Sequence, residues 1–544
     1  MNPQKYNFKR RPSSVAKAGS VEIGGVNPIR VQSMCNTNTN DTESSAAQAK
    51  RIADAGGELV RLTTQGVKEA ANMAAIKSAL NDLGCNVPLV ADVHFNPNAA
   101  FEAAHTCDKV RINPGNFVDA ARTFKKLEFT DQEYATEIDR IRAKFVPFLQ
   151  LCKEHDTCVR LGVNHGSLSD RIMSRYGDTP AGMVESVMEF LRIAREVDFD
   201  NIVISVKASN VTVMVATVRL LVETMDKENM HFPIHLGVTE AGDGEDARIK
   251  SAAGIGTLLA EGIGDTIRVS LSEDPEREIP VAVKLRDYVL ERNGHEQVPL
   301  PENVLPGKAR DYAVSLPYAE FPVMGLDFEL DEKWHYVSTS MAPALFGDDL
   351  PVVLTTSNEN RPGAMKSWID RFVALGAHNP VIVMMGFLTT EKEDFQIQAA
   401  ADFAPLLLDG YASGIGIVAS EKFSKDEVVS VALGILQATR LRISKTEYIA
   451  CPSCGRTLFD LQKTLAEVKK HTAHLKGLKI GVMGCIVNGP GEMADADYGY
   501  VGAGPGKVSI YKGKTLVKKN IPADEALPAL LALIEEDLHF EAEK

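Results

Sequence analysis

The apolar positions in the first half of the chain follow two alternating patterns. Between residues 30 and 271, short runs of branched apolar residues alternate with longer segments whose apolar residues recur at helical spacing. We predict eight strands, at residues 29–34, 59–64, 88–94, 109–115, 158–166, 201–209, 233–240 and 265–271. We predict helices at residues 42–55, 67–83, 132–154, 179–197, 211–226 and 247–261. Eight strand–helix units in about 250 residues are typical of a (β/α)8 barrel, and a doubly wound open sheet is the alternative.

The rest of the chain contains two further α/β segments. After a last barrel helix predicted at residues 272–292, three prolines mark a linker, at positions 299, 301 and 306. Strands are then predicted at residues 351–356, 380–385 and 414–419, and again at 448–450, 478–483 and 507–511. We therefore predict a TIM-type barrel over residues 1–292, an inserted α/β spacer over 293–445 and a C-terminal α/β domain over 446–544. In the spacer, we interpret Arg361 and Lys366 as surface charges.

Composition limits the classes of function that remain. The 59 Lys and Arg residues and 73 Asp and Glu residues give a formal net charge of −14, which argues against nucleic acid as a partner. No apolar run approaches the roughly 20 residues that span a membrane, and Met1–Arg11 does not resemble a signal peptide. The eight cysteines spread over 544 residues do not form a disulfide framework. We expect a cytoplasmic protein.

Five cationic residues lie near the C-terminal ends of the predicted barrel strands. They are Arg61, Arg111, Arg160, Lys207 and Arg268. Strand alternation turns each arginine away from its branched neighbours and toward the barrel mouth, where such barrels place their chemistry. Internal pairing with Asp92 and Glu240 is the alternative, but two carboxylates cannot neutralise five cations. The pattern therefore predicts a ligand with two or more negative charges, such as a diphosphate.

A cysteine motif near the C-terminus predicts a metal centre. Cys451 and Cys454 form a CxxC, and Cys485 lies in a glycine-rich turn that ends at Glu492. A CxxC alone is also found in zinc ribbons and thioredoxin-like sites. A closed zinc site needs four ligands, whereas His471 and His474 are not at the usual zinc spacing. Glu492 is a candidate fourth ligand, and a structural zinc site with Glu492 at the surface is the alternative.

These motifs resemble the 4-hydroxy-3-methylbut-2-enyl diphosphate synthase family of the methylerythritol phosphate route to isoprenoids. The resemblance rests on Cys-Pro-Ser-Cys-Gly-Arg-Thr from residue 451 and Gly-Cys-Ile-Val-Asn-Gly-Pro-Gly-Glu from residue 484. It extends to the barrel segments 91–95, 111–116, 160–167 and 238–242. It implies that Cys451, Cys454, Cys485 and Glu492 bind a [4Fe–4S] cluster. It also implies a long, three-domain form of the family.

The resemblance further implies a substrate, 2-C-methyl-D-erythritol 2,4-cyclodiphosphate, which undergoes reductive ring opening to (E)-4-hydroxy-3-methylbut-2-enyl diphosphate. Electrons are expected one at a time, because a [4Fe–4S] cluster carries one electron at a time. The expected donor is an external ferredoxin or flavodoxin, because no flavin or nicotinamide motif is present. Glu240 is the candidate for handling the proton of the departing oxygen, with His94 as its substitute, and Glu492 is expected to release its iron to substrate. The expected substrate contacts are Arg61, Asp92, Arg111, Asn113, Arg160, Asn164, Lys207, Arg268, Ser270 and Asn488.

Two other interpretations remain open at this stage. One is a pterin-dependent barrel transferase with an attached electron-transfer module, and the other is a redox or metal sensor that binds a phosphorylated effector. The spacer also predicts how the site is assembled. Shorter family members pair head to tail, whereas a spacer of roughly 150 residues is large enough to carry the cysteine domain to the mouth of its own barrel. We expect a site within one chain, with self-association possible but not required.

Overall fold

The chain is represented by a computed structural model that describes residues 5–119, 127–301, 323–324, 333–486, 489–493 and 495–542. Its internal contacts divide the chain into two compact units. The insert unit contains Met1–Arg11, Glu245–Ile263 and Val283–Ser444. The barrel unit contains Pro12–Gly244, Gly264–Ala282 and Lys445–Lys544, so it includes the C-terminal module. The three domain boundaries proposed from the sequence stay a prediction.

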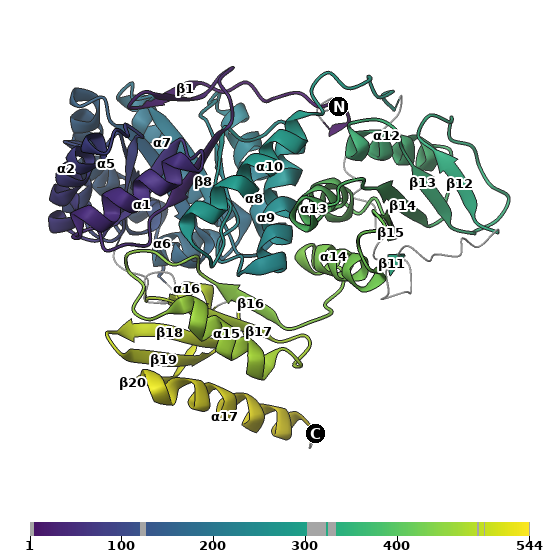
Figure 1. The fold of residues 1–544 in the computed structure, drawn as a ribbon. Helices are drawn as coiled ribbons and strands as arrows, with labels where there is room; N and C mark the ends of the chain where they lie inside the picture. Colours follow the sequence, from purple (N-terminus) through teal and green to yellow (C-terminus); the bar gives the residue numbers. More distant parts are fainter. Residues whose placement is uncertain are drawn as a thin grey trace. The chain divides into compact units, whose positions relative to one another are not determined.

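Eight parallel strands form the centre of the barrel unit (Figure 1). They are β3 (Arg30–Met34), β4 (Leu59–Thr64), β5 (Leu89–Val93), β6 (Lys109–Ile112), β7 (Cys158–Asn164), β8 (Ile202–Lys207), β9 (His235–Leu236) and β10 (Thr266–Ile267). Their order is β8-β7-β6-β5-β4-β3-β10-β9, and a parallel bridge between Ile204 and Ile234 closes the ring. The backbone N–H of Ile204 donates to the carbonyl of Pro233 at 2.9 Å. The predicted barrel is confirmed.

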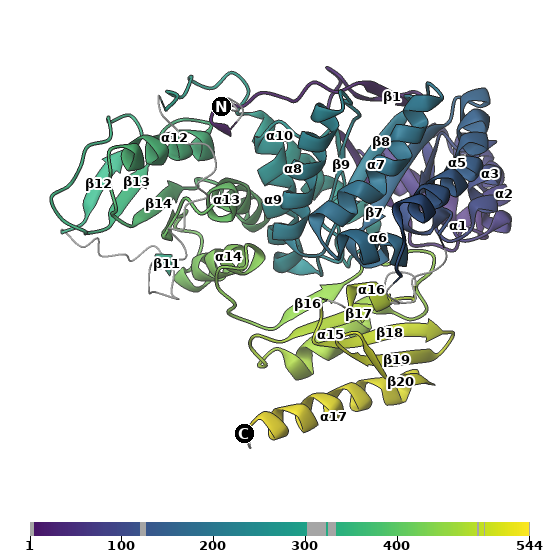
Figure 2. The same cartoon turned by 180° about the vertical axis from the view of Figure 1, so that it is seen from behind.

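Helices follow the strands at nearly the predicted positions (Figure 2). The longer ones are α1 (Thr42–Asp54), α2 (Val67–Asp82), α5 (Asp131–Glu154), α7 (Pro180–Glu196), α8 (Val211–Lys227), α9 (Gly244–Ala260) and α10 (Glu278–Leu290). Capping residues fix their starts: Asp41 accepts a bond from Ser44 N–H, and Thr179 accepts one from Gly182 N–H. Short helices α3 (Pro97–Ala104), α4 (Pro114–Phe117) and α6 (Asp170–Tyr176) were not predicted. No helix among the described residues is long and apolar enough to cross a membrane.

An N-terminal hairpin that the sequence did not predict covers the far end of the barrel. Strands β1 (Val15–Ala18) and β2 (Val21–Gly24) pair antiparallel. Their side chains Ala16, Ala18 and Ile23 are buried in one cluster with residues at the starts of four barrel strands. Those residues are Leu59, Val90, Cys158 and Val203. The N-terminal end of the barrel is therefore filled, which leaves the opposite end for chemistry.

The insert unit contains a second parallel sheet. Its strands are β11 (Val323–Met324), β12 (His335–Ser338), β13 (Val352–Thr355), β14 (Val381–Gly386) and β15 (Gly414–Val418), in the order β11-β15-β14-β13-β12. Helices α12 (Arg361–Ala374), α13 (Lys392–Leu408) and α14 (Lys425–Ala438) follow three of them. Lys366 is 2% exposed and its Nζ lies 2.7 Å from Asp409 Oδ2, so the prediction of a surface charge is wrong. The ion pair with Asp409 offsets the cost of burying the Lys366 ammonium.

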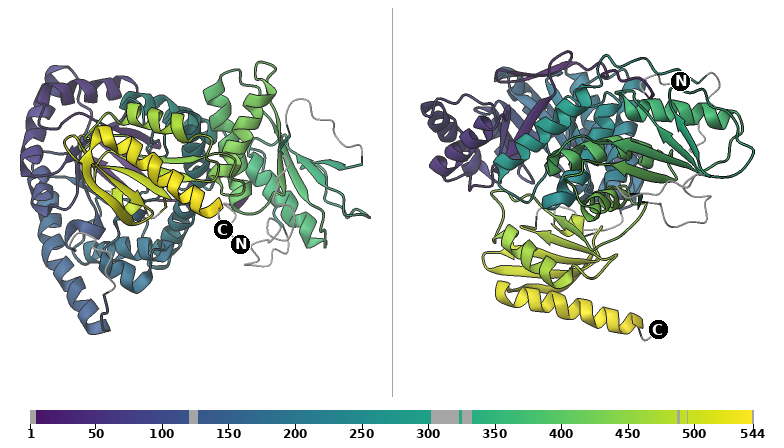
Figure 3. Two further views of the ribbon diagram at one scale, coloured as in Figure 1. Left: turned by 90° about the horizontal axis from the view of Figure 1, so that it is seen from below. Right: turned by 45° about the vertical axis from the view of Figure 1, so that its right-hand side comes forward.

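The C-terminal module, which we call the cysteine lobe (residues 445–542), is a mixed sheet covered on one face by two helices (Figure 3). Its strands are β16 (Glu447–Ala450), β17 (Lys479–Met483), β18 (Tyr498–Gly504), β19 (Lys507–Lys512) and β20 (Thr515–Pro522). Helices α15 (Leu461–Thr472) and α17 (Ala523–Ala542) share one core, to which Leu465 and Leu530 belong. Since β16 and β17 are parallel neighbours, the loops that follow them lie at one edge of the sheet, as the sequence predicts. Strands β18 and β20 were not predicted.

Candidate active site

The predicted cations converge at the C-terminal end of the barrel. Arg61, Arg111, Arg160, Lys207 and Arg268 all line one pocket, and each is less than a tenth exposed. The register explains why they meet, because Arg111 on β6 is the Cα partner of Arg160 on β7. Strand alternation places their side chains inside the ring, away from the helix layer. The pocket predicted from the apolar–Arg–apolar pattern is therefore present.

Carboxylates pair with some of these cations. Arg111 Nη1 lies 2.8 Å from Asp92 Oδ1, and Arg456 Nη2 lies 3.3 Å from Asp92 Oδ2. Arg268 makes two bonds of 2.9 Å to Glu278, at the start of α10, a partner that the sequence-based charge count omitted. Six cations, including Arg456, thus face three carboxylates, counted over the described lining residues and Glu278. The corrected count still leaves an excess of positive charge.

Burial, together with the surrounding positive charge, lowers the pKa values of several of these cations. Burial, followed by the charges of the neighbouring arginines, lowers the pKa of Arg160 and the pKa of Lys207 well below their ordinary values. Burial also lowers the pKa of Arg61 to about 10. Arg160 Nε and Nη1 are buried with no hydrogen-bond partner among the described residues. Buried donors in this state are costly, so the pocket is suited to an anion that would accept from them.

The two candidate proton-transfer residues lie in the same pocket. His94 Nε2 contacts Arg111 Nη1, and burial together with that guanidinium lowers the pKa of His94 well below its ordinary value. His94 is therefore a neutral imidazole at physiological pH. Glu240 is 3% exposed and has a φ of 48°, a backbone conformation that non-glycine residues rarely adopt. Such strain costs on the order of 1–3 kcal/mol and is concentrated at functional sites.

The remaining predicted substrate contacts have different positions. Asn164 and Ser270 line the pocket. Asn113 is not among the lining residues: its Oδ1 caps α4 by accepting from Gly115 N–H at 3.0 Å, and its Nδ2 donates to Ser167 Oγ at 2.8 Å. Asn488 lies outside the described residues. The backbone of Glu492 ends α16 (Gly489–Glu492), but its side chain is also outside the described part of the structure.

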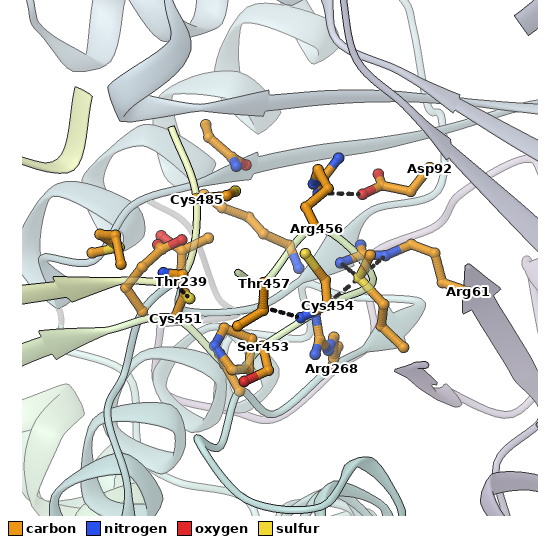
Figure 4. Close-up of a pocket in the computed structure, with 18 of the residues that line it drawn as sticks. Arg61, Asp92, Thr239, Arg268, Cys451, Ser453, Cys454, Arg456, Thr457 and Cys485 are labelled. Carbon is orange, nitrogen blue, oxygen red and sulfur yellow. Dashed lines mark hydrogen bonds and ion pairs between the residues drawn. The ribbon is translucent and has the colours of Figure 1, made fainter. Parts of the chain in front are cut away.

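The three cysteines of the motif line the same pocket, and Cys454 lies close to Arg268 and Arg456 (Figure 4). Cys451 and Cys454 follow β16, and Cys485 follows β17. The backbone N–H of Gly484 donates to Cys451 Sγ at 3.3 Å, and Thr457 Oγ1 accepts from the N–H of Cys454 at 3.0 Å. Three soft thiol ligands in a buried pocket, with a backbone N–H bonded to one sulfur, fit an iron–sulfur cluster.

Close backbone contacts hold the cysteine lobe against the barrel. Ala450 at the end of β16 forms a parallel bridge with Ala241, and the hydroxyl of Ser272 donates to the carbonyl of Cys451 at 2.9 Å. A Cβ added to Gly491 would lie 1.8 Å from the carbonyl oxygen of Gly166, so this position of α16 requires glycine. These contacts hold the cysteine loops at the mouth of the barrel.

Charged contacts surround this interface. His165 of the barrel lies 2.8 Å from Asp178 and 3.5 Å from Asp495 of the lobe. Although burial opposes it, these two carboxylates raise the pKa of His165 to about 10, so the imidazole is charged at neutral pH. Lys469 on α15 forms a further ion pair with Asp243 of the barrel. His165 therefore helps to dock the lobe.

Sequence reasoning missed one pocket residue of clear interest, Arg456. It was quoted only as part of the cysteine motif, and its position two residues after Cys454 is the signal that could have identified it. A hydrogen bond with Cys485, and then the nearby guanidinium of Arg456, lower the pKa of Cys454 well below its ordinary value, against the effect of burial. Figure 4 shows Arg456 between the cysteines and Asp92.

The fold and the pocket define a class of protein: a (β/α)8 barrel with a cation-lined mouth that faces a three-cysteine lobe. Comparison with known proteins identifies the family. The GcpE TIM-barrel domain profile matches residues 13–283, and the GcpE protein C-terminal domain profile matches residues 447–536. The chain belongs to the GcpE family, the 4-hydroxy-3-methylbut-2-en-1-yl diphosphate synthases. The family predicted from the sequence is confirmed.

Its relatives match along nearly their whole lengths. The chain is 52% identical to a protein of Bacteroides thetaiotaomicron named 4-hydroxy-3-methylbut-2-en-1-yl diphosphate synthase (flavodoxin), and the match covers 98% of each chain. It is 44% identical to a protein of the same name from Akkermansia muciniphila and 38% identical to one from Leptospira interrogans, again over 98% of each chain. The insert is therefore shared with these relatives.

Proposed function

We propose that the chain is an iron–sulfur oxidoreductase that opens 2-C-methyl-D-erythritol 2,4-cyclodiphosphate to (E)-4-hydroxy-3-methylbut-2-enyl diphosphate. The reaction takes up two electrons and releases one hydroxyl as water. The observation that supports this function most directly is one buried pocket that combines an excess of cations with three cysteines. The names of the relatives agree with this reaction and favour flavodoxin over ferredoxin as the electron donor.

In this proposal the barrel binds the two phosphates. Arg160, with two buried donors that have no partner among the described residues, is the principal contact, and Arg61 and Lys207 add charge. Glu240 is the candidate for handling the proton of the departing oxygen, with His94 as its substitute, and the lowered pKa of His94 makes the imidazolium form of that residue less available. Asp92 orients Arg111 by an ion pair of 2.8 Å.

The cofactor is proposed to be a [4Fe–4S] cluster held by Cys451, Cys454, Cys485 and Glu492. When bound, such a cluster supplies electrons one at a time and offers a Lewis-acidic iron to the substrate oxygen. The residues of the pocket provide the surroundings that this chemistry needs. They exclude water, since Arg160 and Asp92 are each 2% exposed, and they hold the anion beside the cysteines.

The active site is proposed to lie within one chain, with residues 1–292, 293–445 and 446–544 as its three domains. The contacts of Ala241 with Ala450 and of Ser272 with Cys451 support a lobe that docks on its own barrel. The eight cysteines are all unpaired, which is consistent with the reducing cytoplasm. Mixing an inactive Cys451→Ala chain with an inactive Arg160→Ala chain tests the arrangement. Little recovery of turnover is expected, and substantial recovery would show that two chains share the site.

The function is tested on the full chain, purified and reconstituted without oxygen. Iron and sulfide are measured first, and four of each per chain are expected for a [4Fe–4S] cluster. Turnover of the cyclodiphosphate is then followed with reduced flavodoxin and compared with reduced ferredoxin. A chain that binds the cluster but releases no product with either donor, or with a chemical reductant of low potential, would contradict the proposed reaction.

A further inference from the structure

Arg456 crosses from the cysteine lobe into the anion pocket of the barrel. Among the described lining residues, it is the one cation that the lobe supplies. Its side chain is 9% exposed, and its Nη2 lies 3.3 Å from Asp92 Oδ2. Asp92 is already bound to Arg111 at 2.8 Å. One barrel carboxylate is therefore shared between a barrel cation and a lobe cation.

Two further donors of Arg456 have few acceptors. Nε and Nη1 are buried, and neither makes a hydrogen bond of ordinary geometry with a described residue, although the guanidinium also interacts with the side chain of Cys454. A buried guanidinium with unused donors is costly unless an acceptor arrives. Asp92 favours the charge of Arg456, whereas Arg111 opposes it: burial first, and the charge of Arg456 in addition, lower the pKa of Arg111. The geometry is that of a binding group that awaits an anion.

The docked lobe covers the charged floor of the pocket. Asp92 and Arg160 are each 2% exposed beneath the cysteine loops, and in the proposed scheme the lobe moves away to admit a ligand and returns to cover it. Without a ligand, the five barrel cations oppose the return of Arg456. With a ligand that carries two or more negative charges in place, the same movement brings Arg456 toward an acceptor.

We propose that Arg456 couples anion binding in the barrel to docking of the cysteine lobe, by adding a sixth cation to the pocket only in the docked state. The inference rests on the proposed function, because it requires the barrel to bind a phosphorylated ligand. Linkage then makes the effect reciprocal: the anion favours docking, and docking tightens anion binding by the same factor. Arg456 is a positioning residue in this scheme, since it acts by holding the lobe over the bound ligand.

The backbone N–H of Gly242 reports docking directly, since it donates to the lobe carbonyl of Ala450 at 3.4 Å. Hydrogen exchange of the segment around Gly242 is measured in the full, cluster-loaded chain with and without inorganic diphosphate. In the wild-type chain, diphosphate should slow exchange on the order of 10- to 100-fold, the effect of one charge-assisted hydrogen bond. Arg456→Met should reduce this ratio to about one, and Arg456→Lys should retain part of it.

Lys469→Met is the matched control. It also removes a lobe cation that pairs with a barrel carboxylate, Asp243, but Lys469 is not among the pocket-lining residues. It should increase exchange with and without diphosphate and leave their ratio unchanged. The same ratio in Arg456→Met as in the wild type would overturn the coupling. So would equal loss of protection with and without diphosphate, since that result indicates a purely structural contact.

Calorimetry separates this inference from the proposed function on which it rests. Diphosphate should bind the wild-type chain, and Arg456→Met should bind it more weakly by the same factor that the exchange ratio loses. If diphosphate does not bind the wild-type chain, both the anion pocket and the coupling are wrong. If it binds both chains equally, only the coupling is wrong. If Arg456→Met does not fold, Arg456→Lys is measured instead, and a partial loss of both the exchange ratio and the diphosphate affinity is expected. Wild-type values of both in Arg456→Lys would then overturn the coupling.

Discussion

Buried charges occur both in the barrel unit and in the insert unit, but their partners differ. In the insert unit, Arg292 Nη2 lies 2.6 Å from Asp402 Oδ1, and the two side chains are 2% and 1% exposed. Lys366 pairs with Asp409 at 2.7 Å. In the barrel mouth, by contrast, Arg160 Nη2 lies 3.9 Å from Asp92 Oδ1, and Arg160 keeps two buried donors without hydrogen bonds among the described residues, compared with one, Nη1, on Arg292.

This difference separates structural charges from functional ones. A buried pair that is complete within the chain stabilises the arrangement of the elements that carry it. A buried cation whose partners are missing destabilises the free protein. A missing partner alone does not mark a ligand site, because Lys109 Nζ is buried without a hydrogen bond among the described residues and does not line the pocket. The barrel mouth differs in that several incompletely paired cations meet in one pocket. Both sheets are parallel and both place loops at their strand ends, so the fold alone does not identify which one carries the site. The balance of buried charge identifies the barrel mouth as the site.

Removing a cysteine of the pocket is expected to have the largest effect. Cys451→Ala, Cys454→Ala or Cys485→Ala should each abolish cluster binding and turnover, because three thiolates supply most of the ligands. Iron and sulfide content and the visible absorption spectrum measure the loss. Cys107→Ala serves as the control, since Cys107 is buried in the barrel and does not line the pocket.

Glu492→Ala extends this test to the fourth ligand. Some cluster should remain bound, since the three cysteines are intact, but the iron that meets substrate should change its spectrum and turnover should fall. Wild-type turnover together with an unchanged spectrum would show that Glu492 is not a ligand. The comparison with the cysteine variants distinguishes loss of the cluster from disturbance of one iron.

Breaking the buried pair of the insert unit should affect stability and leave catalysis intact. Arg292→Met removes one of three partners of Asp402, which keeps contacts with Tyr288 and Arg361, and should lower the free energy of unfolding by about 1–3 kcal/mol. Denaturant unfolding measures the change, and kcat of the folded fraction should match that of the wild type. A large loss of kcat with unchanged stability would contradict the division into structural and functional charges.

The opposite outcome is expected in the barrel mouth. Arg160→Met should lower kcat/KM by an amount equivalent to about 2–5 kcal/mol, the scale for one partner of a buried charge contact with a ligand. The same change should raise the melting temperature of the ligand-free chain, because it removes a buried cation beside Arg61 and Arg111. Calorimetric melting and steady-state kinetics test the two parts. A lower melting temperature would mean that Arg160 is a structural charge.

The sequence predicts the barrel and its cations well, because both follow from local periodicity. Period-two alternation determines which face of a strand a side chain occupies, and Arg61, Arg111 and Arg160 obey it. Asn113 was expected in the site from the family resemblance. In the structure its side chain bonds locally to Gly115 N–H and to Ser167, as short polar side chains often do, and its contact with substrate stays a prediction. Alternation does not reveal such local competition.

Other features depend on contacts that no local pattern encodes. Lys366 looked like an isolated charge because its partner, Asp409, lies 43 residues further along the chain. Glu278, which neutralises Arg268, is placed by the start of α10 rather than by a strand. The role of Arg456 depends on how the cysteine lobe docks on the barrel. The prediction therefore failed for ion-pair partners that lie on a different secondary-structure element from the charge they neutralise.

The smallest expected effect is a pH dependence that originates from Lys207. Burial and the charges of Arg160 and Arg61 lower the pKa of this ammonium well below its ordinary value of 10.5 in the ligand-free pocket. A bound anion favours the charged form and raises that pKa. Between the two pKa values, binding therefore takes up a proton, and the affinity for diphosphate falls as pH rises, by at most about tenfold per pH unit.

Calorimetry in buffers with different enthalpies of ionisation measures this proton uptake. Diphosphate itself titrates, so the comparison is with Lys207→Met, which should show a smaller uptake and a weaker pH dependence than the wild type. The control is Lys366→Met, because Lys366 is equally buried but already paired with Asp409, and its loss should leave proton uptake unchanged. Equal uptake in the wild type and in Lys207→Met would show that Lys207 is already charged in the empty pocket. The excess of cations in the barrel mouth would then not lower the charge of Lys207, and the buried cations of the two units would not differ in protonation.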